Sequence, residues 1–379
     1  MVATLERTAL PRAPAKRRRE ANLRIPGPTT LPPAVRRAVA EQMINHRGPE
    51  FAALLGEITE GTQRVFNTKN DVLFFPASGT GGLEAAIVNS FSPGDRVLSI
   101  TIGSFGERWC EIARAFGLDV DHMQLEWGSA ADPVEVERRL SAHGPFKGVL
   151  VTHNETSTGV TNPVAQLTGI VRRHEALFLV DAVSSMGAIP FQTDGWDVDI
   201  AITGSQKAWM CPPGMAMLSV SSRAWEAHAR ARLPRSYFDF GAARDYQQRG
   251  QTPYTPAVGI MYGLRAALRL MEKEGLTQVF RRHHLVAERA RKAVRALGLD
   301  LAADRNHFSD TVTSVKASAG VDLKLAFKRL RDEHDVVLAT GQEHWRDTHF
   351  RIGHLGHVRR ADIDHALDAL GQVLTSLRS

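Results

Sequence analysis

Between residues 70 and 220, short apolar runs alternate with stretches whose apolar positions recur at helical spacing. Continuous Val, Leu and Ile runs separated by amphipathic helices are typical of a mainly parallel sheet that is covered on both faces. The strands predicted in this way span residues 71–77, 96–101, 118–123, 148–153, 177–182, 198–203 and 215–220. The helices predicted between them span residues 81–91, 105–116, 133–140 and 164–175. The pattern therefore predicts an α/β fold.

After residue 220 long helices come first, and strands return only towards the end of the chain. Helices are predicted over residues 256–276, 278–297, 323–333 and 360–377, and strands near 311–317, 335–341 and 349–356. Strands mixed with helices in this way indicate a smaller α+β domain. We therefore expect a basic tail over residues 1–22, a large domain with an N-terminal arm over residues 23–265, and a small C-terminal domain over residues 266–379.

The positive charge of the chain is concentrated at its beginning. The net charge is +6, of which +5 belongs to the first 24 residues. The remainder is almost neutral and lacks the basic face of a nucleic-acid-binding domain, so no nucleic-acid partner is expected. We interpret the tail as a disordered extension of a cytoplasmic protein; a transit peptide is the alternative, against which Glu6 and Glu20 argue. No apolar run approaches the ~20 residues that span a bilayer, so no membrane association is expected.

The sequence predicts neither a disulfide framework nor a metal site. The two cysteines, Cys110 and Cys211, are most simply reduced structural thiols. The histidine pairs 354/357 and 344/349 are joined by no carboxylate or cysteine cluster. We expect no metal.

Candidate chemistry gathers at the ends of predicted strands, where sheets of this kind bind ligands. Lys207 follows the strand of residues 198–203 and precedes a Pro-Pro-Gly turn. Asp181 ends an apolar run, where a carboxylate needs a cation or a hydrogen-bond donor. A salt bridge between Asp181 and Lys207 is the alternative interpretation. Residues 78–82, Ser-Gly-Thr-Gly-Gly, open a helix whose free N–H groups suit a phosphate; a tight turn without a ligand is the alternative.

A phosphate cradle, a buried carboxylate and a strand-end lysine are together what pyridoxal 5′-phosphate (PLP) requires. The lysine amine forms a Schiff base with the aldehyde of this cofactor. The carboxylate keeps the pyridine nitrogen protonated, and the phosphate occupies the helix N-terminus. Phe105 ends a neighbouring strand and could stack on the ring; an ordinary core aromatic is the alternative.

Motifs over nearly the whole folded chain resemble the class V, fold-type I PLP-dependent aminotransferases, especially their alanine–glyoxylate and serine–glyoxylate branch. The resemblance extends from about residue 23 to the C-terminus, with the motifs in family order and at family-like spacing. They are IPGPTTLPP, SGTGGLEAAIVN, GSFGER, HNETSTGV, VDAVSSMGAIP, GSQKAWMCPPG, TPAVGIMYGL and RIGHLG. The resemblance implies a mainly parallel central sheet with helices on both faces, a small α+β domain and a homodimer.

The resemblance also implies a role for each matching position. Lys207 would be the Schiff-base lysine and proton shuttle, and Asp181 would pair with the pyridine nitrogen. Phe105, where the family often has Trp, and Val183 would lie on opposite faces of the ring, and Thr156 would bond its hydroxyl. The phosphate would be held by Ser78, Gly79, Thr80 and Gln206, with Thr255 reaching in from the other subunit.

The same resemblance assigns the substrate carboxylate to Arg351 as a bidentate fork; a surface strand arginine is the alternative. Asn154, His46 and Arg47 are further candidates for contacts with the substrate. The family often has a tyrosine slightly before the threonine matched by Thr255. Here the choice between Thr252 and Tyr254 stays open.

The implied reaction is a ping-pong transamination in which Lys207 moves the proton from Cα of the amino acid. Serine, alanine or glycine are the expected donors and glyoxylate or pyruvate the acceptors, with aspartate or ureidoglycine as alternative donors. A cysteine desulfurase, the alternative of the same fold, needs a nucleophilic cysteine in the C-terminal part, and none follows Cys211. A non-enzymatic PLP-domain regulator that binds DNA through the tail is disfavoured by the neutral body.

Overall fold

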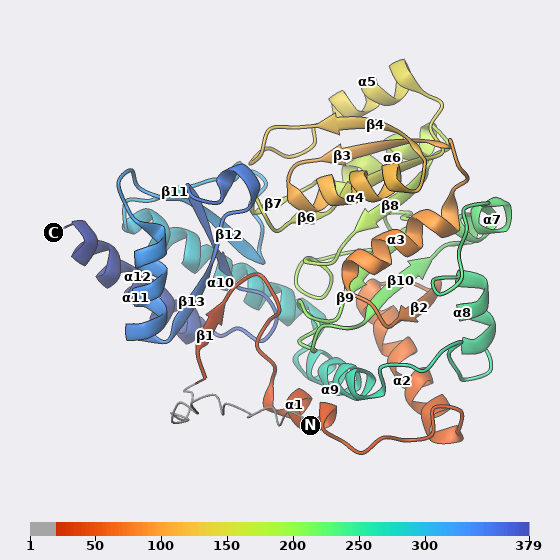
Figure 1. Ribbon diagram of the computed structural model, residues 1–379, viewed down its shortest axis with the longest axis horizontal. Coiled ribbons are helices and arrows are strands. Elements are labelled where there is room, and N and C mark those ends of the chain that lie inside the picture. Colours follow the sequence, from red (N-terminus) through yellow and green to blue (C-terminus); the bar gives the residue numbers. More distant parts are fainter. Residues whose placement is uncertain (1–19, 379) are drawn as a thin grey trace, which may run out of the picture.

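The computed structural model describes residues 20–378, which form a large and a small sheet with helices packed around them (Figure 1). The large sheet has the strand order β2-β10-β9-β8-β5-β3-β4. From β9 to β4 all neighbours are parallel, whereas β10 is antiparallel to both β9 and β2. The strands are β2 (Asp71–Phe75), β3 (Arg96–Thr101), β4 (Asp119–Gln124), β5 (Gly148–Thr152), β8 (Leu177–Asp181), β9 (Ile200–Gly204) and β10 (Ala216–Val220).

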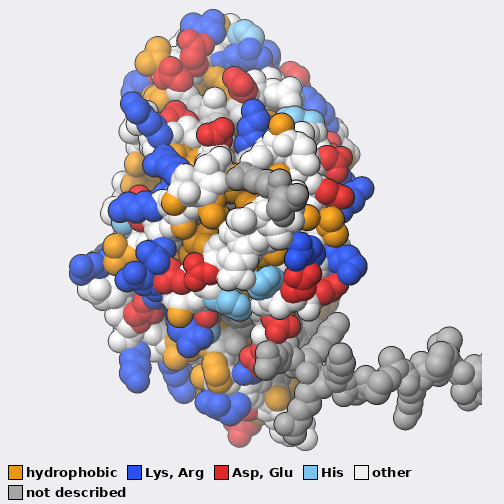
Figure 2. All heavy atoms as spheres, turned by 90° about the vertical axis from the view of Figure 1, so that its left-hand side faces the viewer, with side chains coloured by type: hydrophobic (Ala, Val, Ile, Leu, Met, Phe, Trp, Pro, Cys, Tyr) orange, Lys and Arg blue, Asp and Glu red, His pale blue; other side chains and the backbone are white. Residues whose placement is uncertain are grey.

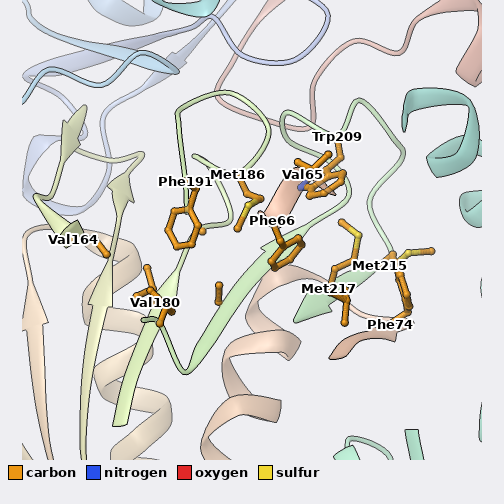
Figure 3. Close-up of a cluster of buried hydrophobic side chains, with 14 of the residues drawn as sticks. Val65, Phe66, Phe74, Val164, Val180, Met186, Phe191, Trp209, Met215 and Met217 are labelled. Carbon is orange, nitrogen blue, oxygen red and sulfur yellow. The ribbon is translucent and has the colours of Figure 1, made fainter. Parts of the chain in front are cut away.

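Both faces of the large sheet are buried, because alternate residues of its strands belong to two different cores. On β8, Phe178 and Val180 face the core of α1, α2, α5, α6 and α9, and Leu179 faces the core of α3, α4, α7 and α8. Figure 3 shows part of the first core, where the rings of Phe66 and Trp209 lie 6.0 Å apart. The helices are α1 (Pro33–Val39), α2 (Pro49–Phe66), α3 (Gly79–Ser90), α4 (Ser104–Ala115), α5 (Pro133–His143), α6 (Val164–Arg173), α7 (Ser222–Arg230), α8 (Phe240–Gln247) and α9 (Val258–Glu274).

The small sheet has the order β1-β13-β14-β12-β11, and the helices α10, α11 and α12 pack against it. Its first strand, β1, comes from the N-terminal arm and pairs in parallel with β13, while the other pairs are antiparallel. A two-stranded hairpin, β6 with β7, lies between the sheets (Figure 1). These elements are β1 (Asn22–Arg24), β6 (Asn154–Glu155), β7 (Val160–Thr161), α10 (Leu276–Ala296), β11 (Asp300–Leu301), β12 (Val312–Lys316), α11 (Leu323–His334), β13 (Val336–Thr340), a 3-10 turn η1 (Glu343–Trp345), β14 (His349–Gly353) and α12 (Arg360–Arg378).

The expected domain boundary after residue 265 falls inside one continuous helix, α9. Leu264 and Ala267, on either side of that point, are both buried in the core of the large sheet. Gly275, with φ of +81°, separates α9 from α10, whose buried residues belong to the small domain. Residues 1–19 of the expected disordered tail lie outside the described residues.

Basic and acidic side chains are interspersed on the face of the small domain seen in Figure 2. Within residues 20–378, no helix is long and apolar enough to cross a membrane. In the same part of the chain, no group of three or more His, Cys, Asp or Glu side chains is placed to hold a metal ion. Both cysteines are buried and free.

Candidate active site

Lys207 follows β9 and is covered by the N-terminal arm. Its Nζ donates a hydrogen bond of 2.6 Å to the carbonyl oxygen of Pro26. Thr29 anchors the arm, because its N–H donates to the carbonyl oxygen of Gln206 at 3.0 Å and its hydroxyl to that of Lys207 at 2.9 Å. At Gly27, with φ of +131°, a Cβ would lie 2.8 Å from Cδ of Lys207. Glycine is therefore required where the arm crosses the lysine.

The surroundings of Lys207 favour a neutral amine. The side chain is only 8% exposed. Burial lowers the pKa of Lys207 to about 8, with Arg351 acting in the same direction and Asp181 and Glu155 acting against it. An amine with this pKa is substantially neutral near pH 8, which is the form that attacks a carbonyl carbon or accepts a proton.

Asp181 ends β8, the strand next to β9. Its Oδ1 accepts a hydrogen bond of 2.9 Å from the N–H of Val183, and its Oδ2 accepts one of 3.4 Å from the hydroxyl of Thr152. Burial raises the pKa of Asp181 to about 7, and the charge of Glu155 adds to this effect. Among the described residues Asp181 makes no ion pair with Lys207, so the salt-bridge interpretation does not account for either group.

The N-terminus of α3 is open at the carboxyl end of β2. Ser78, the N-cap residue, is exposed and makes no capping bond with its side chain. The first N–H groups of the helix are therefore available to an anion. Gln206 lies beside them, since a Cβ on Gly204 would be 3.0 Å from its Oε1 and 3.4 Å from the nitrogen of Gly79. That Oε1 is buried without a hydrogen-bond partner.

The N-terminus of α3 packs tightly against the residues that follow Asp181. A Cβ on Gly79 would lie 2.7 Å from Cγ2 of Val183, two residues after Asp181. Thr80, the next residue of the helix, is half-buried. A phosphate at the open helix end would be met by the Gln206 amide, turned to present its NH₂ group, while Val183 and Asp181 follow directly alongside. The residues present therefore fit PLP.

Phe105 is the second residue of α4 and faces Lys207. The amine of Lys207 lies 5.9 Å from the centroid of the Phe105 ring. The guanidinium of Arg108, one turn later, lies 5.0 Å from the same centroid. The N–H of Phe105 donates to Oε2 of Glu155 at 3.1 Å. The structure thus brings this predicted ring-stacking residue next to the predicted Schiff-base lysine.

Asn154, a predicted substrate contact, uses its side-chain amide within the protein. Its Nδ2 donates to the hydroxyls of Ser184 at 2.7 Å and Thr311 at 2.9 Å, and its Oδ1 accepts from the hydroxyl of Thr161 at 2.9 Å. Thr311 precedes β12, so this amide joins the two domains. A substrate would have to replace one of these bonds to reach it.

Arg351 points from the small sheet towards the large domain, because its sequence neighbours on β14 face the opposite side and pack against the helices. Its Nε donates to the carbonyl oxygen of Thr340 at 2.9 Å. Its Nη1 donates to the carbonyl oxygen of Thr156 at 3.2 Å and to Oε1 of Gln342 at 2.7 Å. Burial lowers the pKa of Arg351 to about 10, which leaves it a cation at neutral pH.

His46, Arg47 and Thr255 have no bond to Lys207 in the described part of the chain. Arg47 donates three hydrogen bonds of 2.6–3.2 Å to residues 251–253, and Thr255 is exposed. Among the described residues, no hydrogen bond or ion pair joins any of these three side chains to Lys207.

Thr252 and Tyr254 are engaged in the same segment. The hydroxyl of Thr252 donates to the carbonyl oxygen of Tyr254 at 2.7 Å. The ring of Tyr254 stacks on Tyr237 with 4.8 Å between their centroids. Both side chains thus have partners within their own part of the chain, and the choice between them as a phosphate contact stays open.

Three residues that bond to Lys207, Phe105 or Arg351 were not predicted from the sequence. Pro26 and Glu155 lie inside motifs that were recognised, and Gln342 follows a predicted strand directly. The signal for Glu155 was a carboxylate in the otherwise uncharged segment NETSTGV. Pro26 acts through its backbone carbonyl, which side-chain patterns do not reveal.

Comparisons with known proteins agree with this geometry. The family model for class-V aminotransferases matches residues 25–363. The soluble hydrogenase 42 kDa subunit of Anabaena cylindrica is 41% identical over 94% of this chain and 93% of its own length. The L-aspartate–glyoxylate aminotransferase of Paracoccus denitrificans is 41% identical over 89% of this chain and 87% of its own.

Among solved structures, the alanine–glyoxylate aminotransferase of Nostoc sp. superposes with a TM-score of 0.92 at 32% identity, covering 98% of this chain and all of that one. The family resemblance and the expected α/β architecture are thereby confirmed. The chain belongs to the class-V aminotransferases.

Proposed function

We propose that this aminotransferase uses PLP to move an amino group from a small amino acid to glyoxylate or pyruvate. One observation carries the proposal: Lys207 and Asp181 are buried after neighbouring strands, beside an open helix N-terminus and an unpartnered Gln206. Glyoxylate as the acceptor is supported by the names of two relatives, an aspartate–glyoxylate and an alanine–glyoxylate aminotransferase.

When bound, PLP supplies an aldehyde carbon that a lysine can hold covalently and a ring that withdraws electrons from the substrate. Lys207 would be the residue that holds this carbon, and its amine would move the proton of the amino acid Cα. Asp181 holds the proton at the pyridine nitrogen. The first turn of α3, with Ser78, Gly79, Thr80 and Gln206, binds the phosphate.

Four further side chains would orient the ring and the substrate. Phe105 and Val183 would pack against the ring, and Thr156 would bind its hydroxyl. Arg351 binds the substrate carboxylate through the part of its guanidinium that faces away from Thr340 and Gln342. Its three bonds to the protein fix the direction of the guanidinium before a substrate enters.

We further propose a homodimer in which each subunit completes the site of the other. Thr255 is exposed, and Arg47 ties the neighbouring segment to the start of α2. In the dimer this unit would bring Thr255 to the phosphate and His46 to the substrate of the second subunit. The experiment is a measurement of mass in solution by light scattering, for which a monomer would contradict the proposal.

The hydrogenase name of one relative supports no second proposal. Within residues 20–378, no group of His, Cys, Asp and Glu side chains is arranged to hold a metal ion. The groups that do lie together are the amine of Lys207, the carboxyl group of Asp181 and the open N-terminus of α3.

Two measurements test the main proposal. The purified protein should absorb in the near-visible, and Lys207→Ala should abolish both this band and transamination. A panel of serine, alanine, aspartate and glycine against glyoxylate, pyruvate and 2-oxoglutarate then identifies the substrates. A band that persists in Lys207→Ala would assign the covalent bond to another residue, and a wild-type panel without any turnover would contradict the activity.

A further inference from the structure

Glu155 is a completely buried carboxylate with no assigned role, and every hydrogen bond it makes is an accepted one. Its Oε2 accepts from the N–H groups of Phe105 and Gly106, both at 3.1 Å. Its Oε1 accepts from the N–H of Ser157 at 3.0 Å and from the Ser157 hydroxyl at 2.7 Å. Burial raises the pKa of Glu155, whereas the four donors around it, with no acceptor among them, act in the opposite direction and favour the ionised form.

The local chain is shaped to admit this side chain. Helix α4 begins after Gly103, which has no side chain with which to cap the helix. A Cβ at this position would lie 2.5 Å from Cγ of Glu155 and 2.3 Å from Oγ of Ser157. The hairpin strand β6 therefore supplies the cap that the α4 segment lacks, and the capped residue is Phe105, whose ring faces Lys207.

The charge of Glu155 also acts on the groups that carry the proposed chemistry. Burial lowers the pKa of Lys207 and of Arg351, and a charge on Glu155 acts against that shift; it adds to the effect of burial in raising the pKa of Asp181. The site thus contains two buried carboxyl groups, Asp181 and Glu155, and two buried basic groups, Lys207 and Arg351. Removing one carboxylate leaves an excess of positive charge around the lysine amine.

We propose that Glu155 is a positioning residue of this site, which holds the first turn of α4 so that the Phe105 ring faces Lys207 and supplies a second negative charge beside the amine. The inference rests on the proposed PLP-dependent function and deepens it. The alternative is a cap that stabilises α4 and has no influence on Lys207.

The first test uses the apoprotein and needs no catalysis. Lys207 is labelled with formaldehyde and cyanoborohydride across a pH series, and its modification is measured by mass spectrometry of the peptide. We expect the midpoint to fall by roughly one pH unit in Glu155→Gln, because an opposing charge is lost. Ser157→Ala, which removes one donor but keeps the charge, should leave the midpoint in place. An unchanged midpoint in folded Glu155→Gln would overturn the inference.

The second test uses the holoenzyme and covers the case in which Glu155→Gln does not fold. Glu155→Asp keeps the charge on a shorter side chain that cannot reach both pairs of donors. We expect the labelling midpoint of the Glu155→Asp apoprotein to be retained, while the circular dichroism of the near-visible band of its holoenzyme decreases because the Phe105 ring is no longer fixed. A wild-type dichroic band in Glu155→Asp would contradict the positioning role. Loss of the band in Lys207→Ala is independent of either result, so the proposed function stands or fails separately.

Discussion

The amine of Lys207 and the carbonyl oxygen of Pro26 are joined by a hydrogen bond of 2.6 Å, across which the N-terminal arm meets the large domain. The next residue of the arm, Gly27, leaves no room for a Cβ beside the lysine side chain. The position of the amine therefore depends on the path of the arm as well as on the loop that follows β9.

Gly27→Ala should displace Lys207 without unfolding the protein. A Cβ would lie 2.8–3.0 Å from three atoms of the lysine side chain, and the backbone there has φ of +131°. We expect kcat/KM to fall by ~10²-fold, as is typical of a reacting group moved by about an ångström. The matched control is Gly94→Ala, where φ is +81° but nothing lies within 4 Å of a Cβ. The control should lose about 1–2 kcal/mol of stability and retain its activity.

The apoprotein should capture PLP with a pH dependence set by Lys207. Only the neutral amine attacks the aldehyde, and burial lowers its pKa to about 8. The capture rate should therefore rise as the pH increases through 8 and level off above it. Arg351→Gln removes a neighbouring cation and should move the midpoint upward. Stopped-flow absorbance gives both values, and a wild-type rate that climbs without an inflection beyond pH 10 would refute the assignment.

Asp181→Asn should reduce kcat by ~10²–10⁴-fold, the usual range for a group that controls a proton, because an amide cannot hold the pyridine nitrogen protonated. Circular dichroism serves as the control for folding. A variant with wild-type kcat would remove Asp181 from the mechanism.

The same substitution should change how stability depends on pH. Burial raises the pKa of Asp181 from 3.8 to about 7, so the folded state holds a proton that the unfolded state releases between these values. This carboxyl group therefore makes the wild-type apoprotein less stable as the pH rises from about 4 to 7. Asn has no such dependence. The melting temperature of Asp181→Asn relative to that of the wild type should therefore be higher at pH 8 than at pH 5. Equal differences at the two pH values would contradict the buried, protonated carboxyl.

Gln206→Met should weaken PLP binding by roughly 10-fold or more, since it removes a hydrogen bond to a charged phosphate. Gln206→Glu, of nearly the same size, should weaken it further through repulsion between two anions. Titration of the apoprotein with PLP, followed by absorbance, gives both dissociation constants. Identical affinity in all three proteins would place the phosphate elsewhere.

Mixed dimers should reveal whether Thr255 acts across the subunit interface. Lys207→Ala and Thr255→Glu are each expected to be inactive, but a hybrid dimer contains one site with Lys207 from one subunit and Thr255 from the other. Random reassociation of equal amounts should restore about a quarter of the wild-type activity. No restoration, with hybrids verified by mass spectrometry, would show that the two residues serve the same subunit.

The strands of the large sheet were predicted well from the sequence. All seven strands of the large sheet are predicted within a few residues, because a sheet buried on both faces needs continuous apolar runs. Asp181 and Lys207 follow two of these runs, and neighbouring parallel strands bring them together. The antiparallel direction of β10 could not be predicted, because a strand that is buried on both faces has the same continuous apolar sequence in either direction.

Contacts between segments far apart in the sequence could not be predicted from it. The position of β1 in the small sheet depends on pairing with β13, more than 300 residues later. The saturated amide of Asn154 and the buried carboxylate of Glu155 depend on donors from other elements. His46 and Thr255 matched family positions in the sequence, yet a single chain leaves them apart from Lys207.

The arm of residues 22–29 begins as a strand of one domain and ends hydrogen-bonded to the backbone of Gln206 and Lys207 in the other. Only Ile25, Pro26, Gly27 and Pro28 lie between β1 and Thr29. So short a tether has little slack, and any rotation of the small domain relative to the large one must pull directly on the backbone over Lys207. Through these four residues, the orientation of the small domain, which carries Arg351, is coupled to the position of the Lys207 amine.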